Sequence, residues 1–250
     1  MRKDVVRRSQ RDVLGAVLVG LSSVAMLAAL GMVFLYAPRE ATMGDVQRIF
    51  YFHVASAWIG FFAFFVTCLA GIGYLVQGDR RWDALAFSSV EIGLTFITMT
   101  LLTGALWARP VWGTYWTWEP RLTISAVQWL IYVAYRMLRA AIEVPERRAR
   151  FAAVYGIVAF VTVPLSWFAI RWWRTIHPDI LMGEAGMAIA PQMVHALVVS
   201  VAAFTLLYVT LLRLRMRLER AADALACLRA ITLQEGHSDG TPVQSRCTTS

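Results

Sequence analysis

Apolar residues fall into six long runs along the chain, at about residues 13–36, 49–76, 84–107, 122–142, 152–173 and 192–212. A helix rises about 1.5 Å per residue, so roughly 20 apolar residues cross the ~30 Å hydrocarbon layer of a membrane. Each run reaches that length, and polar or Gly/Pro-containing segments separate the runs. The pattern predicts an all-α integral membrane protein with six transmembrane helices.

Composition agrees with this class, because 58% of the 250 residues are hydrophobic, 16% are charged and the mean hydropathy is +0.57. The net charge of +8 does not indicate a nucleic-acid partner, since the arginines stand beside the ends of the apolar runs. Sixteen Arg and Lys residues occupy the N-terminal tail, the start of the C-terminal tail and the second–third and fourth–fifth connections, against six in the other connections. The positive-inside rule therefore predicts that both termini are cytoplasmic.

The first run is expected to remain as a helix, because it is longer than a signal-peptide core and no Ala-x-Ala site follows before Arg39. We divide the chain into a cytoplasmic N-terminal tail, 1–12, a six-helix domain, 13–212, and a cytoplasmic C-terminal tail, 213–250. The last segment is polar after about Leu233 and is predicted to be partly disordered.

The connection between the third and fourth runs is dense in aromatic residues, since three tryptophans and a tyrosine fall between Trp112 and Thr123. Trp112, Tyr115, Trp116 and Glu119 are spaced i, i+3, i+4 and i+7. This spacing predicts a short helix ending at Pro120, with these side chains on one face and Trp118 offset. Such an outward-facing interfacial segment can cradle a flat apolar ligand with polar edges, whereas a membrane anchor needs fewer aromatic rings.

Two histidines lie at matched depth near the outward ends of separate predicted helices. His53 is about four residues inside the second run, and His195 is similarly shallow in the sixth, where Pro191 can begin the helix. Imidazole is a good iron ligand, and ionisable residues inside membrane spans are functional candidates. The pair predicts axial ligation of a heme iron. Ala57 and Gly60 share the face of His53 and leave room for a macrocycle, or else pack against another helix.

Three further polar residues are candidates. Arg48 and Arg121 lie just outside the predicted spans, where a guanidinium group can bind a carboxylate bidentately or anchor to lipid phosphate. Glu91 is the one carboxylate inside a span, and we expect it to pair with a cytoplasmic-side residue such as Arg136. His177 precedes a proline and indicates a loop turn.

The segment from Trp112 to Thr123 closely resembles the tryptophan-rich signature of the heme-handling proteins of cytochrome c assembly. The six-span layout, with one histidine before the signature and one after it, is similar to the heme exporter C type of that family. The resemblance covers about residues 13–212. It implies that His53 and His195 are axial ligands of heme b. It also implies that the heme platform is formed by Trp112, Trp116, Trp118 and Glu119. The implied partners of the heme propionates are Arg48 and Arg121.

The same resemblance implies a component of cytochrome c biogenesis in the bacterial inner membrane. Such proteins hold heme at the outer face and present it to a membrane-tethered heme chaperone. The implied partners are the ATPase and permease subunits of an ABC transporter and a small single-span membrane subunit. We expect heme binding and transport rather than enzymatic catalysis.

Alternatives stay open at this point. Glu119 stands where the signature usually has Asp, Tyr115 replaces a Trp, and a proline after the acid leans toward the heme-channel subunit of a cytochrome c synthase. Six spans favour the exporter type. A b-type electron-transfer cytochrome would need ligands near both membrane faces, and a secondary transporter using Glu91 would need interrupted helices and a midplane site.

Overall fold

The computed structural model describes residues 2–173, 175–177 and 189–235, and within them it contains helices and no β-strand. The elements are α1 (Arg2–Gly31), a π-helical turn η1 (Met32–Tyr36), a 3-10 turn η2 (Asp45–Gln47), α2 (Arg48–Gln77), α3 (Arg80–Trp112), α4 (Pro120–Ala141), α5 (Pro145–Ala159), α6 (Thr162–Trp172) and α7 (Pro191–Glu235). The predicted all-α class is confirmed. The polar segment predicted to be disordered lies largely outside the described residues.

Glycine and proline set several helix ends. α2 is capped by Gly78 and α3 by Gly113, with φ of 68° and 77°, a left-handed conformation that favours glycine. Pro120, Pro145 and Pro191 begin α4, α5 and α7. A proline costs no hydrogen bond there, because the first N–H groups of a helix have no partner within it.

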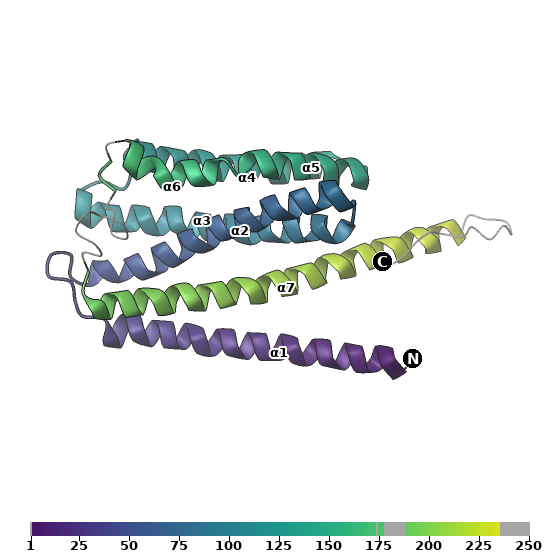
Figure 1. Ribbon diagram of the computed structural model, residues 1–250, viewed down its shortest axis with the longest axis horizontal. Helices are drawn as coiled ribbons and strands as arrows, with labels where there is room; N and C mark the ends of the chain where they lie inside the picture. Colours follow the sequence, from purple (N-terminus) through teal and green to yellow (C-terminus); the bar gives the residue numbers. More distant parts are fainter. Residues whose placement is uncertain (1, 174, 178–188, 236–250) are drawn as a thin grey trace.

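Within the part of the chain that the structure describes, five segments are long and apolar enough to span a membrane, namely Val13–Tyr36, Asp45–Gln77, Arg80–Trp112, Pro145–Trp172 and Pro191–Ala222. The remaining predicted span is α4, whose 22 residues extend about 33 Å. Its hydropathy is lower because the residues it buries all carry polar groups: Gln128, Tyr132, Tyr135 and Arg139. α4 lies alongside α5 and α6 in the bundle (Figure 1), so the layout agrees with six crossings.

The fifth predicted span is divided into two helices. α5 ends at Ala159 and α6 begins at Thr162. Pro164 follows the break, and because it has no N–H it cannot continue the backbone ladder to Phe160. The two helices together still form one 28-residue crossing segment.

The connections lie at two ends of the bundle (Figure 1). The start of α1, the end of α7 and the α2–α3 and α4–α5 connections lie at one end, called here the terminal end. The α1–α2 and α3–α4 connections, the end of α6 and the start of α7 lie at the opposite end. This separates the connections as the basic residues predict, and the cytoplasmic assignment of the terminal end stays a prediction.

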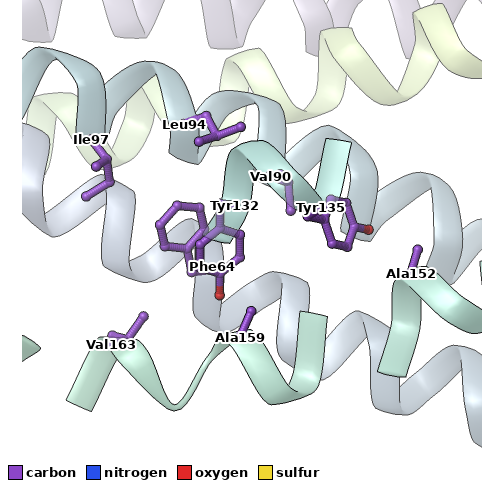
Figure 2. Close-up of a cluster of buried hydrophobic side chains, with 9 residues drawn as sticks. All are labelled: Phe64, Val90, Leu94, Ile97, Tyr132, Tyr135, Ala152, Ala159 and Val163. Atoms are coloured by element: carbon purple, nitrogen blue, oxygen red, sulfur yellow. The ribbon is translucent and has the colours of Figure 1, made fainter. Parts of the chain in front are cut away.

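The centre of the bundle is the pair α2 and α3, with α1 and α7 on one side and α4, α5 and α6 on the other (Figure 1). In the main core cluster, Phe64 of α2 stacks on Tyr132 of α4, and Val90 and Leu94 of α3 complete the contact (Figure 2). Gly60 serves helix packing rather than ligand space, because a Cβ atom there would lie 2.3 Å from Cδ1 of Ile97.

Candidate functional site

A cavity of about 590 Å³ lies at the opposite end of the bundle, where α2, α4 and α7 begin and α3 and α6 end. This volume lies within the usual range of small-molecule and cofactor sites. Its walls are mostly apolar and aromatic. The polar and aromatic side chains that line it include His53, Trp107, Trp112, Trp116, Arg121, Trp167, Arg171 and His177.

His53 is fixed by two neighbours on α3. Its Nδ1 lies 3.2 Å from Oγ1 of Thr103, and that hydroxyl donates to the carbonyl of Met99 at 2.7 Å. The hydroxyl proton is therefore used, so Nδ1 is the donor and Nε2 keeps its lone pair. Gly104 admits the ring, since a Cβ atom there would lie 2.9 Å from Cε1 of His53. The arrangement presents an imidazole nitrogen suited to ligating a metal.

The tryptophan-rich segment is not the short helix predicted from its spacing. α3 ends at Trp112, Gly113 takes the left-handed conformation, and residues 113–119 are bends and irregular chain up to the start of α4. The indole rings pack edge to face instead, Trp107 on Trp112 at 5.2 Å and Trp116 on Trp118 at 5.7 Å between centroids.

Because the segment is irregular, only part of the predicted platform lines the cavity. Trp112 and Trp116 line the cavity, whereas Trp118 does not and is 80% exposed. Nε1 of Trp107 and of Trp116 are buried without a hydrogen-bond partner among the described residues. The cavity wall therefore offers indole N–H donors beside flat apolar faces.

Glu119 holds two chain segments together rather than lining the cavity. Its Oε2 accepts a hydrogen bond from Oγ1 of Thr175, and the same Thr175 oxygen accepts from the backbone N–H of His177 at 3.1 Å. Burial raises the pKa of the Glu119 carboxyl, and the N–H of Leu122 and the charge of Arg121 act against that rise. His177, interpreted from sequence as a loop turn, is thereby placed in the cavity wall.

Only one of the two predicted propionate partners reaches the cavity. Arg121 lines it, donates to the backbone carbonyl of Ser166 and lies 5.7 Å from the ring of Phe61. Arg48 is directed elsewhere, because it bonds the carboxylate of Asp45 at 3.2 Å and the carbonyl of Val33.

His195 is exposed and does not line the cavity. Its Nδ1 lies 3.1 Å from the hydroxyl of Tyr36, and the two rings stack with centroids 6.2 Å apart. Val198 and Ala202, three and seven residues later on α7, do line the cavity. Positions with this spacing share one helix face, so His195 stands on the cavity-lining face about one turn beyond it.

Sequence reasoning missed Trp107, Trp167 and Gly104. Trp107 closes the third apolar run, and both tryptophans were available as aromatic residues near outward helix ends. Gly104 gave no usable signal, because its role depends on the helix that faces it. The small residues that the spacing places near His53, Ala57 and Gly60, lie on its own helix.

At the terminal end, Glu91 binds Nη2 of Arg136 at 3.1 Å, as predicted, and also Nε of Arg215 at 2.5 Å. The carboxylate is thus held between α4 and α7.

The fold and cavity define a helical integral membrane protein with a cofactor-sized site at one end. The family model for heme exporter protein C matches residues 5–228, so the chain belongs to that family. Heme exporter protein C of Bradyrhizobium diazoefficiens is 36% identical over 84% of this chain and 81% of its own length. Heme exporter protein C of Rhodobacter capsulatus is 31% identical over 84% of this chain and 88% of its own length. A mitochondrial protein of Marchantia polymorpha, named for cytochrome c biosynthesis, is 26% identical over 75% of this chain and 80% of its own length.

Proposed function

We propose that the protein binds heme in the cavity and presents it to a membrane-tethered heme chaperone during cytochrome c biogenesis. The observation that carries this proposal is the orientation of His53, whose Nε2 remains available as an iron ligand inside a cavity walled by tryptophan. The names of the relatives, which refer to heme export and cytochrome c biosynthesis, support the same function.

The residues present fit a heme b. His53 would hold the iron, Trp112 and Trp116 would contact the flat macrocycle, and Arg121 would bind a propionate. The indole N–H groups of Trp107 and Trp116 would donate hydrogen bonds to other polar atoms at the edge of the heme. The bound heme supplies the iron and the reactive vinyl side chains, whereas the chain binds, orients and shields them.

His195 is proposed as the second axial ligand. It lies on the cavity-lining face of α7, and its ring would have to move away from Tyr36 to reach a heme bound in the cavity. Arg48 and Glu119 are then supporting residues, because Arg48 ties the α1–α2 connection to the start of α2 and Glu119 ties the tryptophan segment to Thr175. Trp118, exposed at the rim, is the part of the platform available to the chaperone.

The proposed setting is the bacterial inner membrane, with the terminal end in the cytoplasm and the cavity at the outer face. The proposed partners are the ATPase and permease subunits of an ABC transporter and a small single-span subunit. A cysteine introduced at Thr114 should react with an impermeant thiol reagent from outside the cell, and one at Pro145 should not. The reverse pattern would invert the orientation.

A dithionite-reduced spectrum of the purified protein tests the proposal. One b-type heme is expected, whereas an electron-transfer cytochrome with ligands near both faces would show two. Of the three histidines in the described part of the chain, His53 and His177 line the cavity and His195 lies in the second turn of α7, so all three are at the opposite end. Co-purification with a chaperone that carries covalent heme would support delivery. A heme-free protein that purifies without such a chaperone would contradict it.

A further inference from the structure

α4 carries a continuous polar stripe through the interior of the bundle. The residues it buries are Gln128, Tyr132, Tyr135 and Arg139, all with hydrogen-bonding side chains. Arg121 and Ser125 extend the same stripe, because the spacings from one member to the next alternate between four and three residues. A helix face inside a membrane bundle is normally apolar, since polar groups there must find partners.

The two ends of this stripe reach different regions. Arg121 and Ser125 line the cavity, where the Ser125 hydroxyl lies 3.3 Å from that of Ser166. Arg139 is paired with Asp83 of α3 near the terminal end, through two nitrogens, with Nη2 at 3.0 Å from Oδ2. The stripe therefore runs from the cavity to an ion pair near the other end of α4.

The middle of the stripe has polar atoms that the protein does not satisfy. Gln128 and Tyr132 are completely buried, and both amide atoms of the first and the hydroxyl of the second have no hydrogen-bond partner among the described residues. Buried tyrosines with protein partners provide a contrast. Tyr208 is 1% exposed and bonds Ser89 at 2.7 Å, and the hydroxyl of the partly buried Tyr155 donates to the carbonyl of Ile131 at 3.0 Å.

The hydroxyl groups of Tyr132 and Tyr135 point toward α5, at the small side chains of Ala159 and Ala152 (Figure 2). Small neighbours leave room beside a hydroxyl, and buried polar groups without protein partners are the usual binding sites of internal water.

We propose that internal water molecules bind along the α4 stripe and form a hydrogen-bonded path from the cavity to the Asp83–Arg139 pair. The waters satisfy the Gln128 amide and the two tyrosine hydroxyls. The path gives the cavity proton exchange with the terminal end without opening the bundle. It does not involve the histidines, and it stands whether or not heme is the ligand of the cavity.

Radiolytic hydroxyl labelling of the full-length protein in nanodiscs, in water enriched in oxygen-18, tests the path. Radicals formed from bound water label buried side chains beside it. Tyr132 and Tyr135 should be labelled several-fold faster than Tyr208, the buried tyrosine whose hydroxyl has a protein partner. Equal protection of all three tyrosines would overturn the proposal.

Gln128→Leu tests whether the path is continuous. It removes both unpartnered amide atoms and should reduce the labelling of Tyr132 several-fold. Val127→Leu, on the exposed face of the same turn, should leave it unchanged. Unaltered Tyr132 labelling in folded Gln128→Leu protein would overturn the continuity. If that variant does not fold, the comparison with Tyr208 in the unmodified protein decides alone.

Discussion

At the terminal end, three guanidinium groups lie 4.5–5.9 Å from the ring centre of Phe87, and each is paired with a carboxylate. At the opposite end, the buried Nε1 atoms of Trp107 and Trp116 and Oε1 of Glu119 have no hydrogen-bond partner among the residues described. Buried polar groups normally find partners, so an unsatisfied group marks a site where another molecule can supply one. We therefore assign a role in stability to the ion pairs around Phe87, called here the paired end, and a role in binding to the cavity.

The ion pairs at the terminal end tie α4 and α7 to α3. Asp83 and Glu91 belong to α3, their arginine partners Arg136 and Arg139 to α4, and Arg215 to α7. The charges there fix the relative position of three helices, whereas the two arginines that line the cavity, Arg121 and Arg171, lie at the start of α4 and the end of α6.

The largest effect is expected from the ligand histidines. His53→Ala or His195→Ala should remove most bound heme or shift its spectrum to a weaker-ligand form, because each loses an imidazole nitrogen at the iron. His177→Ala should keep the axial-ligand spectrum. Absorption spectra and heme-to-protein ratios measure this. If both single variants retain the spectrum and stoichiometry of the unmodified protein, the ligand assignment is wrong.

A change at the paired end should affect stability instead. Asp83→Asn leaves the buried Arg139 charge without its carboxylate, and breaking a buried pair in this way costs about 3–5 kcal/mol of folding free energy. Thermal unfolding in detergent should show the loss, while the folded fraction keeps its heme spectrum. Arg39→Gln, in the exposed Arg39–Asp45 pair, is the matched control and should be nearly silent. Equal stability of the two variants would contradict the assignment.

The link between Glu119 and Thr175 should have a smaller effect, confined to the cavity. Thr175→Val removes the hydroxyl that bonds Glu119, which should loosen the tryptophan segment and speed heme dissociation several-fold. Thr175→Ser retains the hydroxyl and should behave like the unmodified protein. Stopped-flow transfer of heme to a heme-scavenging globin measures the rate. Identical rates for the valine and serine variants would show that the hydrogen bond is dispensable.

The smallest effects are expected from the rim. Trp116→Phe should weaken heme binding, and Trp118→Phe should leave binding intact but reduce loading of the chaperone, since only Trp116 lines the cavity. Each lost aromatic contact should cost about 0.5–1.5 kcal/mol. Heme titration and covalent loading of the chaperone separate the two steps. Normal loading by the double variant at unchanged protein level would leave the tryptophans as membrane anchors only.

The apolar runs predicted the helical class and the position of each membrane-crossing segment, because a long apolar segment in a membrane has few structures other than a helix available to it. It missed the break between α5 and α6, although Pro164 signals it. The helix expected across the tryptophan segment was wrong, because Gly113 ends α3 in the left-handed conformation and the next helix begins only at Pro120. Once the backbone there is irregular, which indole faces the cavity depends on tertiary contacts.

The depth of the histidines in their helices could be predicted from the sequence, and His53 does line the cavity. The positions of Arg48 and His195 depend on their rotation about the helix axis and on neighbours distant in sequence. Tyr36, which contacts His195, is 159 residues away. Pairings over such separations are absent from any local pattern.

Gly104 shows how a residue without functional groups can determine where a functional group stands. Its missing side chain is the space that the His53 ring occupies, so the two positions behave as one shape shared between α2 and α3. A protein designer who grafts only the histidine onto another helix pair would obtain an imidazole turned away from its pocket. The transferable unit is the histidine, the hydroxyl that fixes its tautomer and the hollow in the facing helix.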